Sequence, residues 1–301
     1  MTFRTETLDL ALAGGCRRAG DFLELTKPRV TLMVLMTTFV GFYLGSESAP
    51  DYLRMVYTLM GTGLAAGGTL ALNQFIEREA DALMQRTRHR PLPDGRMHPS
   101  EALLFGLLLT AGGLMVLALD VNPASTLVTA FIAGSYLLLY TPLKQKTPLC
   151  STVGAVPGAM PPVIGWAAAR GDLGIGAWVL FAILFLWQIP HTLAIARLYR
   201  DDFAKAGIQF LPVIEPDGES TGRQIISHCL ALLAVSLLPN LIGLAGSIYF
   251  IIALLLGVGF VAAGARLAIS QSLAAARRLL FASLIYLPVL LVVMALDRVP
   301  F

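Results

Sequence analysis

The sequence predicts an all-α polytopic membrane protein, with about nine transmembrane helices around a central cavity that opens to the cytoplasmic side. Three observations predict this class. The 301 residues are 56% hydrophobic and only 14% charged, whereas soluble domains are closer to a quarter charged. The apolar residues come in blocks of about 20, the length at which a helix crosses a bilayer. Such blocks are much longer than the strands of a membrane β-barrel, which have about ten residues.

The apolar spans follow one another along most of the chain. In order, they cover residues 28–46, 52–74, 100–119, 123–141, 149–168, 175–196, 224–243, 246–268 and 279–296. The link between 224–243 and 246–268 is so short that these two spans are expected to form a hairpin. The span at 149–168 is rich in Gly and Pro, which a transmembrane helix tolerates where neighbours or a cavity satisfy the freed backbone groups. It is therefore a candidate cavity wall.

Basic residues lie mostly on one side of these spans. Of the 22 Lys and Arg residues, all but Arg54, Arg170 and Arg298 fall on the side that carries the N-terminus. Cytoplasmic loops carry such an excess, so the pattern predicts a cytoplasmic N-terminus and an external C-terminus. We expect a multi-pass protein of the bacterial cytoplasmic membrane. Residues 1–27 would form a cytoplasmic N-terminal segment, and residues 28–301 a single transmembrane domain.

The most informative polar segment ends the second span. Asn73, Glu77 and Asp81 are four residues apart, and on a helix of about 3.6 residues per turn they share one face. Hard oxygen donors of this kind suit Mg²⁺, which often binds through one or two carboxylates plus substrate phosphates. Arg86 and Arg90 follow, and guanidinium groups bind phosphate oxygens well. Taken singly, the same residues also fit an ordinary cytoplasmic loop with i,i+4 ion pairs.

Two more polar segments follow the fourth and sixth spans on the same side. In the first, Tyr140 suits an interfacial aromatic, and Lys144 suits a snorkelling or phosphate-binding lysine. In the second, His191 lies in or near the apolar region, where ionisable side chains are costly and mark functional sites; a satisfied core histidine is the alternative. Asp201 and Asp202 follow it. They would either furnish a second metal site that faces the first carboxylate pair or simply keep a loop soluble.

Together these segments resemble the UbiA-type intramembrane prenyltransferases. The likeness runs from about Leu25 to Pro212 in four ordered motifs: NQFIEREADALMQRTRHRPLP, YTPLKQKT, AVPGAMPPVIGW and WQIPHTLAIARLYRDDFAKAGIQFLPV. The first motif marks the whole superfamily, whereas the Trp-Gln-Ile-Pro-His and Ala-Gly…Leu-Pro elements resemble the branch that modifies haem. Leu198 occupies the position at which members that act on quinone precursors carry the first of two acidic residues. The sequence therefore does not decide whether a second metal site is present.

The resemblance implies a farnesyl transfer. Members of the haem branch move the farnesyl group of farnesyl diphosphate to a vinyl group of haem b (protohaem IX), with water addition, and give haem o and diphosphate. The resemblance implies that Mg²⁺ is bound by the catalytic residues Asn73, Glu77, Asp81 and Asp202, together with the neighbouring Asp201. The resemblance also implies that the diphosphate is bound by Arg86, Arg90, Lys144 and Tyr140. His191 would contact haem.

Two alternatives stay open at this point. One is prenylation of a quinone or chlorophyll precursor by the same chemistry, and the other is transport of haem or lipid without bond cleavage. The expected partners are farnesyl diphosphate, haem b and the lipid bilayer. A haem A synthase or a terminal oxidase assembly factor is a candidate protein partner, and no nucleic acid is expected.

Overall fold

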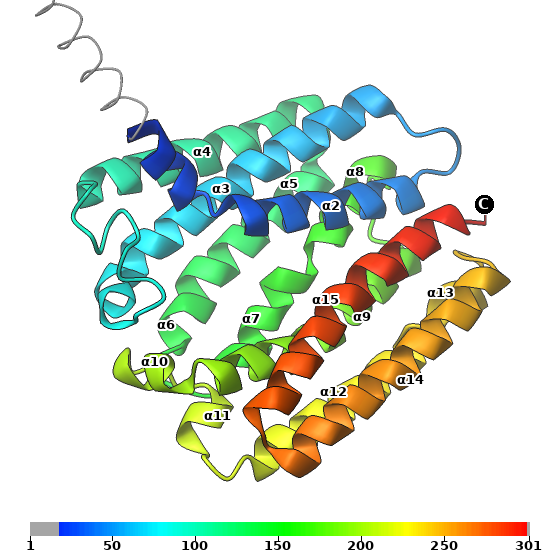
Figure 1. Cartoon of the computed structure of the whole chain (residues 1–301). Coiled ribbons are helices and arrows are strands. Elements are labelled where there is room, and N and C mark those ends of the chain that lie inside the picture. The colour runs from blue at the N-terminus through cyan, green and yellow to red at the C-terminus, as the bar shows by residue number, and fades with distance from the viewer. Residues whose placement is uncertain (1–17, 300–301) are drawn as a thin grey trace, which may run out of the picture.

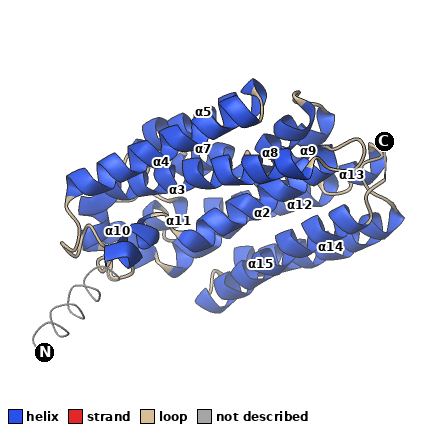
Figure 2. Ribbon diagram, turned by 90° about the horizontal axis from the view of Figure 1, so that it is seen from above, coloured by secondary structure: helices blue, strands red, loops and turns tan. Residues whose placement is uncertain are grey.

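Helices make up the fold, as the computed structural model of residues 18–299 shows (Figure 1). Within those residues, β structure is limited to one isolated bridge between Ala245 and Arg298, which confirms the all-α class (Figure 2). In chain order, the elements are α2 (Pro28–Gly45), α3 (Tyr52–Leu83), α4 (Pro99–Asp120), α5 (Pro123–Gly134), the π-helical turn η1 (Ser135–Tyr140), α6 (Thr141–Leu143), α7 (Cys150–Ala159), α8 (Pro161–Arg170), α9 (Ile175–Leu198), α10 (Arg200–Lys205), α11 (Leu211–Ile214), α12 (Glu219–Val235), α13 (Leu238–Leu241), α14 (Ser247–Ser270) and α15 (Leu273–Leu296).

Eight helical segments of the described residues are long and apolar enough to cross a membrane. They match eight of the expected spans. The span expected at 149–168 is instead two ten-residue helices, α7 and α8, which meet at Met160. Pro161 and Pro162 cause the break, because neither has the N–H group that would continue the helical hydrogen bonds. The expected count of nine is thus approximate, and corresponds to eight continuous spans and one broken span within residues 18–299.

Glycine at the helix contacts brings the helices close together. α2 packs against α8, and α3 packs against α4. A Cβ atom on Gly165 of α8 would lie 2.5 Å from the backbone nitrogen of Phe42 and would collide with the carbonyl oxygen of Thr38. Small residues allow this approach in membranes, where van der Waals packing largely replaces the hydrophobic effect between helices.

The helices after α9 form a group of their own. α14 packs against both α12 and α15, and α12 and α15 also pack against α9. The largest buried apolar cluster runs through this group and includes Leu180, Ile225 and Leu290, each 0% exposed. The hairpin expected from the spans at 224–243 and 246–268 is present, since α12 packs on α14 after the short α13 (Figures 1 and 2). α9 is therefore held by α12 and α15, and it also packs against α7.

The polar segments lie at one end of the molecule. Figure 1 shows α10 and α11 at the end opposite the C-terminal end of α15. Large apolar side chains remain exposed on the outside of the helices, among them Leu119, Leu255 and Ile269, which are 77%, 67% and 84% exposed. An apolar surface of this kind suits contact with lipid rather than water.

Candidate active site

The C-terminal part of α3 carries the face expected to bind metal. Asp51 caps the start of α3, because its side chain accepts a hydrogen bond from the backbone nitrogen of Arg54, and the helix continues to Leu83, beyond the end of the expected span. Asn73, Glu77 and Asp81 therefore lie on one helix. Asn73 is 0% exposed and Asp81 is 2% exposed. Polar groups that are buried this far need partners.

Both carboxylates of this face are paired with cations. The Nζ atom of Lys144 lies 2.6 Å from Oε1 of Glu77, and Nη1 of Arg90 lies 2.6 Å from Oδ2 of Asp81. Lys144 also lies over the ring of Tyr140, 4.5 Å from its centroid. The structure thus brings together side chains from two motifs that are distant in the sequence.

Lys27, which the sequence analysis missed, joins this group. Its Nζ atom donates a hydrogen bond to Oδ1 of Asn73 at 2.9 Å. The amide nitrogen of Asn73 donates to Oγ1 of Thr141 at 3.2 Å, and this hydroxyl donates to the carbonyl oxygen of Tyr136 at 2.8 Å. The chain of bonds fixes the Asn73 amide with its oxygen toward Lys27. The signal that was available is the basic pair Lys27 and Arg29 just before the first span.

Lys27 sits in an unusual setting for a lysine. Its backbone has φ of 47°, in the left-handed region that non-glycine residues rarely adopt. Burial, together with the nearby charges of Arg90 and Lys144, lowers the pKa of Lys27 to about 7. A bound anion beside Lys27 would favour its charged form. This group of side chains at the end of α3 is therefore suited to an anionic ligand.

Asp202 and Asp201 do not join the carboxylates of α3. Oδ2 of Asp202 accepts a hydrogen bond from the backbone nitrogen of Arg86 at 3.4 Å. The guanidinium carbon of Arg86 lies 5.9 Å from the ring centroids of both Tyr199 and Phe203. Arg86, Tyr199 and the two aspartates line a second, polar pocket of about 700 Å³. No three His, Cys, Asp or Glu side chains gather as a metal site within residues 18–299.

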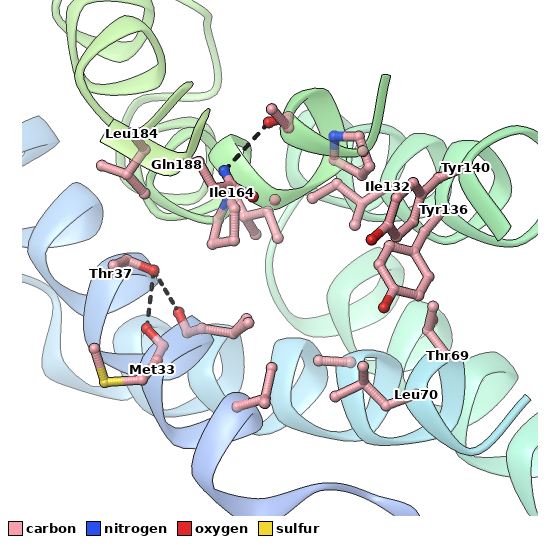
Figure 3. A pocket seen from close by; sticks show the side chains of 18 of the residues that line it. Met33, Thr37, Thr69, Leu70, Ile132, Tyr136, Tyr140, Ile164, Leu184 and Gln188 are labelled. Carbon is pink, nitrogen blue, oxygen red and sulfur yellow. Dashed lines mark hydrogen bonds between the residues drawn. The ribbon is translucent and has the colours of Figure 1, made fainter. Parts of the chain in front are cut away.

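An apolar cavity of about 530 Å³ lies between α2, α3, α5, η1, α7, α8, α9 and α15. In Figure 3, Thr37 and Leu70 lie on one side of it, with Ile132 and Tyr136 across from them. The wall also includes Gly154, Pro157 and Gly158 of α7, which confirms that the Gly- and Pro-rich span lines a cavity. An isoprenoid chain is the kind of ligand that an apolar space of this size accepts.

Two tyrosines contribute to the cavity from the π-helical turn η1. The rings of Tyr136 and Tyr140 are 5.2 Å apart and both line the cavity. Because a π-helical turn has a wider register than an α-helix, it changes which side chains face inward, and such turns are frequent at functional sites. Tyr140 also contacts Lys144, so η1 connects the apolar cavity with the charged group at the end of α3.

His191 lines the same cavity from α9. Its ring stacks on Trp187 with 4.7 Å between centroids, and its Nδ1 atom lies 2.7 Å from Oγ of Ser283 on α15. His191 thus belongs to the apolar part of the site. Trp187 and Ser283 are contacts that the sequence analysis did not single out.

Comparison with known proteins decides the family. The chain matches the UbiA prenyltransferase family over residues 34–285. The chain belongs to the UbiA prenyltransferase family. It is therefore an integral, multi-pass membrane prenyltransferase, and the enzymatic activity expected from its motifs is confirmed.

Curated relatives of this UbiA member carry a more specific name. The protein from Solibacter usitatus is 50% identical over 287 residues, which cover 92% of this chain and 98% of the relative. The protein from Koribacter versatilis is 44% identical and covers 99% of each chain. The protein from Myxococcus xanthus is 42% identical and covers 94% of this chain and 96% of the relative. Each is named Protoheme IX farnesyltransferase.

Solved structures of UbiA-type proteins have the same fold. A structure of digeranylgeranylglyceryl phosphate synthase superposes with a TM-score of 0.79 at 18% identity, and covers 93% of this chain and 98% of that chain. A UbiA homologue from Archaeoglobus fulgidus bound to GPP and Mg²⁺ superposes with a TM-score of 0.64 at 17% identity, and covers 91% and 99%. The helical membrane architecture expected from the sequence is thereby confirmed.

Proposed function

We propose that this UbiA-family member transfers the farnesyl group of farnesyl diphosphate to a vinyl group of haem b, with addition of water, and gives haem o and diphosphate. The observation that carries the proposal is the agreement of the curated relatives, which share the name Protoheme IX farnesyltransferase over at least 92% of this chain. The site supports it, because an apolar cavity ends beside a charged group that suits a diphosphate.

We assign the diphosphate to cations around the end of α3. Arg90 and Lys144 are the central pair, since each already holds a carboxylate of α3. Lys27 adds a buried amine, and Arg86 adds a guanidinium at the polar pocket. Tyr140 lines the cavity beside Lys144. Cations fixed in these positions would stabilise the negative charge that develops on the leaving diphosphate.

The oxygen donors nearby fit Mg²⁺. Asn73, Glu77 and Asp81 offer only oxygen atoms, which is the donor set that Mg²⁺ prefers, and each now holds a side-chain cation that a divalent ion would replace. We assign Asp202, with Asp201 beside it on α10, to a second Mg²⁺ position in the polar pocket that Arg86 also lines. When bound, Mg²⁺ would supply Lewis-acid stabilisation of the diphosphate.

The apolar cavity would hold the isoprenoid chain and keep water from it. As the C–O bond of farnesyl diphosphate breaks, positive charge develops on the allylic carbon, and the vinyl electrons of haem b attack that carbon. Water then completes a hydroxyethylfarnesyl group. Side chains such as Leu70, Ile132 and Ile164 line the cavity and would exclude water before the attack. His191, with Trp187 against its ring, would contact haem.

We infer the placement of the chain from the charge pattern. All but three of the 22 Lys and Arg residues fall on one side of the spans, which supports a bacterial cytoplasmic membrane with the N-terminus in the cytoplasm and the C-terminus outside. Residues 1–27 would be a cytoplasmic segment, of which 1–17 lie outside the described residues. Residues 28–301 would be one prenyltransferase domain. We propose a haem A synthase or a terminal oxidase assembly factor as a protein partner.

The test uses purified full-length protein in lipid nanodiscs with isotope-labelled farnesyl diphosphate, Mg²⁺ and haem b. We expect mass spectrometry to find a farnesylated, hydrated haem and an equal amount of released diphosphate. Labelling of 4-hydroxybenzoate in place of haem would instead support the quinone-precursor reaction. Binding of haem without any diphosphate release would support the hypothesis that the protein transports haem or lipid, and would contradict the proposal.

A further inference from the structure

His191 is attached to the last helix of the chain through one side chain. Its Nδ1 atom lies 2.7 Å from Oγ of Ser283 on α15. Ser283 is 0% exposed, and its backbone carbonyl oxygen accepts a hydrogen bond from Nε1 of Trp187 at 2.9 Å. Because Trp187 also stacks on His191, the serine touches both aromatic residues that α9 presents to the cavity.

The single proton of the Ser283 hydroxyl is already in use. The hydroxyl donates to the carbonyl oxygen of Leu280 at 2.6 Å. A hydroxyl has one proton to donate and two lone pairs to accept with. Toward His191, Oγ of Ser283 must therefore accept, and Nδ1 of His191 must carry the proton. In a neutral imidazole with a protonated Nδ1, the other ring nitrogen, Nε2, has a free lone pair.

Nε2 remains available to a ligand in the cavity. His191 lines the cavity, and within residues 18–299 the imidazole makes its one hydrogen bond at Nδ1. The stack on Trp187 restricts rotation of the ring. A neutral imidazole whose second nitrogen is hydrogen-bonded is the usual form of a histidine that ligates a metal, and the hydrogen bond sets which nitrogen faces the metal.

We propose that Ser283 is a positioning residue that holds His191 as the Nδ1-protonated tautomer, so that Nε2 coordinates the iron of the haem acceptor. The haem part rests on the proposed function, whereas the tautomer follows from hydrogen bonds within the protein. α15 would thereby take part in binding the second substrate. α15 would contribute no group to the diphosphate, but it would set the chemical form of the residue that receives the second substrate.

The first measurement needs no haem. The chain has four histidines, so protein with ¹⁵N-labelled histidine gives few side-chain signals, and the signals missing from His191→Gln identify His191. We expect a protonated Nδ1 and an unprotonated Nε2 in the wild type. In Ser283→Ala, we expect a mixture of tautomers. A protonated Nε2 in the wild type would overturn the proposal.

The second measurement follows haem binding by optical and electron paramagnetic resonance spectroscopy, with ferric protohaem IX as the probe. We expect a histidine-ligated spectrum in the wild type and none in His191→Ala. Ser283→Ala should bind the haem about fivefold to tenfold more weakly, the effect of one lost hydrogen bond, and the KM for farnesyl diphosphate should not change. Ser283→Thr, which keeps the hydroxyl, should restore the spectrum. A wild-type spectrum in both His191→Ala and Ser283→Ala would overturn the proposal.

The two proposals fail in different ways. If the wild type binds haem through His191 but transfers farnesyl only to another acceptor, the proposed function is wrong and the role of Ser283 stands. If haem is farnesylated at the normal rate in Ser283→Ala, with an unchanged KM for haem and an unchanged spectrum, the proposed function stands and the role of Ser283 is wrong.

Discussion

The charged side chains at the end of α3 are held in buried ion pairs. Asp81 is 2% exposed and its counter-charge is Arg90. Glu77 relies in the same way on Lys144. Loss of one member of a buried pair leaves the other charge uncompensated, which costs several kcal/mol. Substitutions that test this region should therefore keep the shape of the side chain and change only its charge or hydrogen bonding.

Asp81→Asn should lower kcat/KM at least about a hundredfold, the size of effect seen when a group that stabilises developing charge is lost. The amide keeps the volume of the carboxyl group but removes its charge. Steady-state release of diphosphate from purified variants measures this. The matched control is Glu79→Gln two residues earlier, whose side chain is 88% exposed, and its activity should equal that of the wild type. Full activity of Asp81→Asn would remove Asp81 from the metal site.

Thr141→Val should raise the KM for farnesyl diphosphate about fivefold, because one hydrogen bond of about 1 kcal/mol is lost. Valine fills the space of threonine but cannot accept from the amide of Asn73, which Thr141 orients at 3.2 Å. Thr141→Ser keeps the hydroxyl and should behave as the wild type. Initial rates over a range of farnesyl diphosphate concentrations separate KM from kcat. Equal KM values in the valine and serine variants would show that Asn73 needs no orientation from Thr141.

Sequence spacing predicted the residues of α3 but not their partners. Asn73, Glu77 and Asp81 share a face because helix geometry alone places every fourth residue together. Their contacts with Lys27 and Lys144 depend on how α2 and η1 pack against α3. Packing between elements that are far apart in sequence leaves no mark in residue spacing, so Lys27 was missed.

Whole elements differ from their expected form where the backbone hydrogen bonds change register. The span at 149–168 has the apolar length of a single helix, yet consecutive prolines at Pro161 and Pro162 divide it into α7 and α8. Its role as cavity wall was predictable from the same composition. The π-helical turn η1 was not predictable, because six residues are too few to reveal a shift of register in a pattern of apolar side chains.

Gly165→Ala should destabilise the protein by about 1–3 kcal/mol, the typical cost of overpacking. Its methyl group would meet backbone atoms of Thr38 and Phe42, which cannot move aside as a side chain can. Thermal unfolding in detergent, followed by circular dichroism, measures the change. Gly112→Ala in α4 is the matched control, because no atom outside its own stretch of helix lies within 4 Å of its new methyl group, and alanine is the better helix former. An equal midpoint for the two variants would contradict close packing of α2 on α8.

At the scale of the whole molecule, the charged group at the end of α3 lies on the same side of the spans as most of the basic residues. The group around α3 faces the side that carries most of the Lys and Arg residues, where water-soluble Mg²⁺ and a diphosphate can reach it. The hydropathy pattern was sufficient to predict eight of the spans, and the charge bias predicts which way they face. The pairing of α9 with α12 and α15 needed the structure.

Single cysteines at exposed loops test the orientation. In intact bacterial cells, a membrane-impermeant maleimide should label Asp172→Cys, which follows α8, in a Cys16→Ser background. It should label Arg88→Cys, which follows α3, only after the cells are permeabilised. Both positions are exposed, and the native Cys150 and Cys229 are buried. Labelling in the reverse order would place the N-terminus outside.

The ion pairs at the end of α3 have a consequence for the order of events at the site. A diphosphate that enters alone competes with Glu77 and Asp81 for Lys144 and Arg90, and a divalent ion that enters alone competes with the same cations for the carboxylates. When both enter, the two ion pairs exchange partners and no charge is left without one. Binding should then be reciprocally coupled, with Mg²⁺ affinity about tenfold or more higher in the presence of a non-hydrolysable farnesyl diphosphate analogue, within the usual range of coupling energies. Calorimetry with and without the analogue measures this, and equal affinities would mean that the ion pairs stay closed throughout.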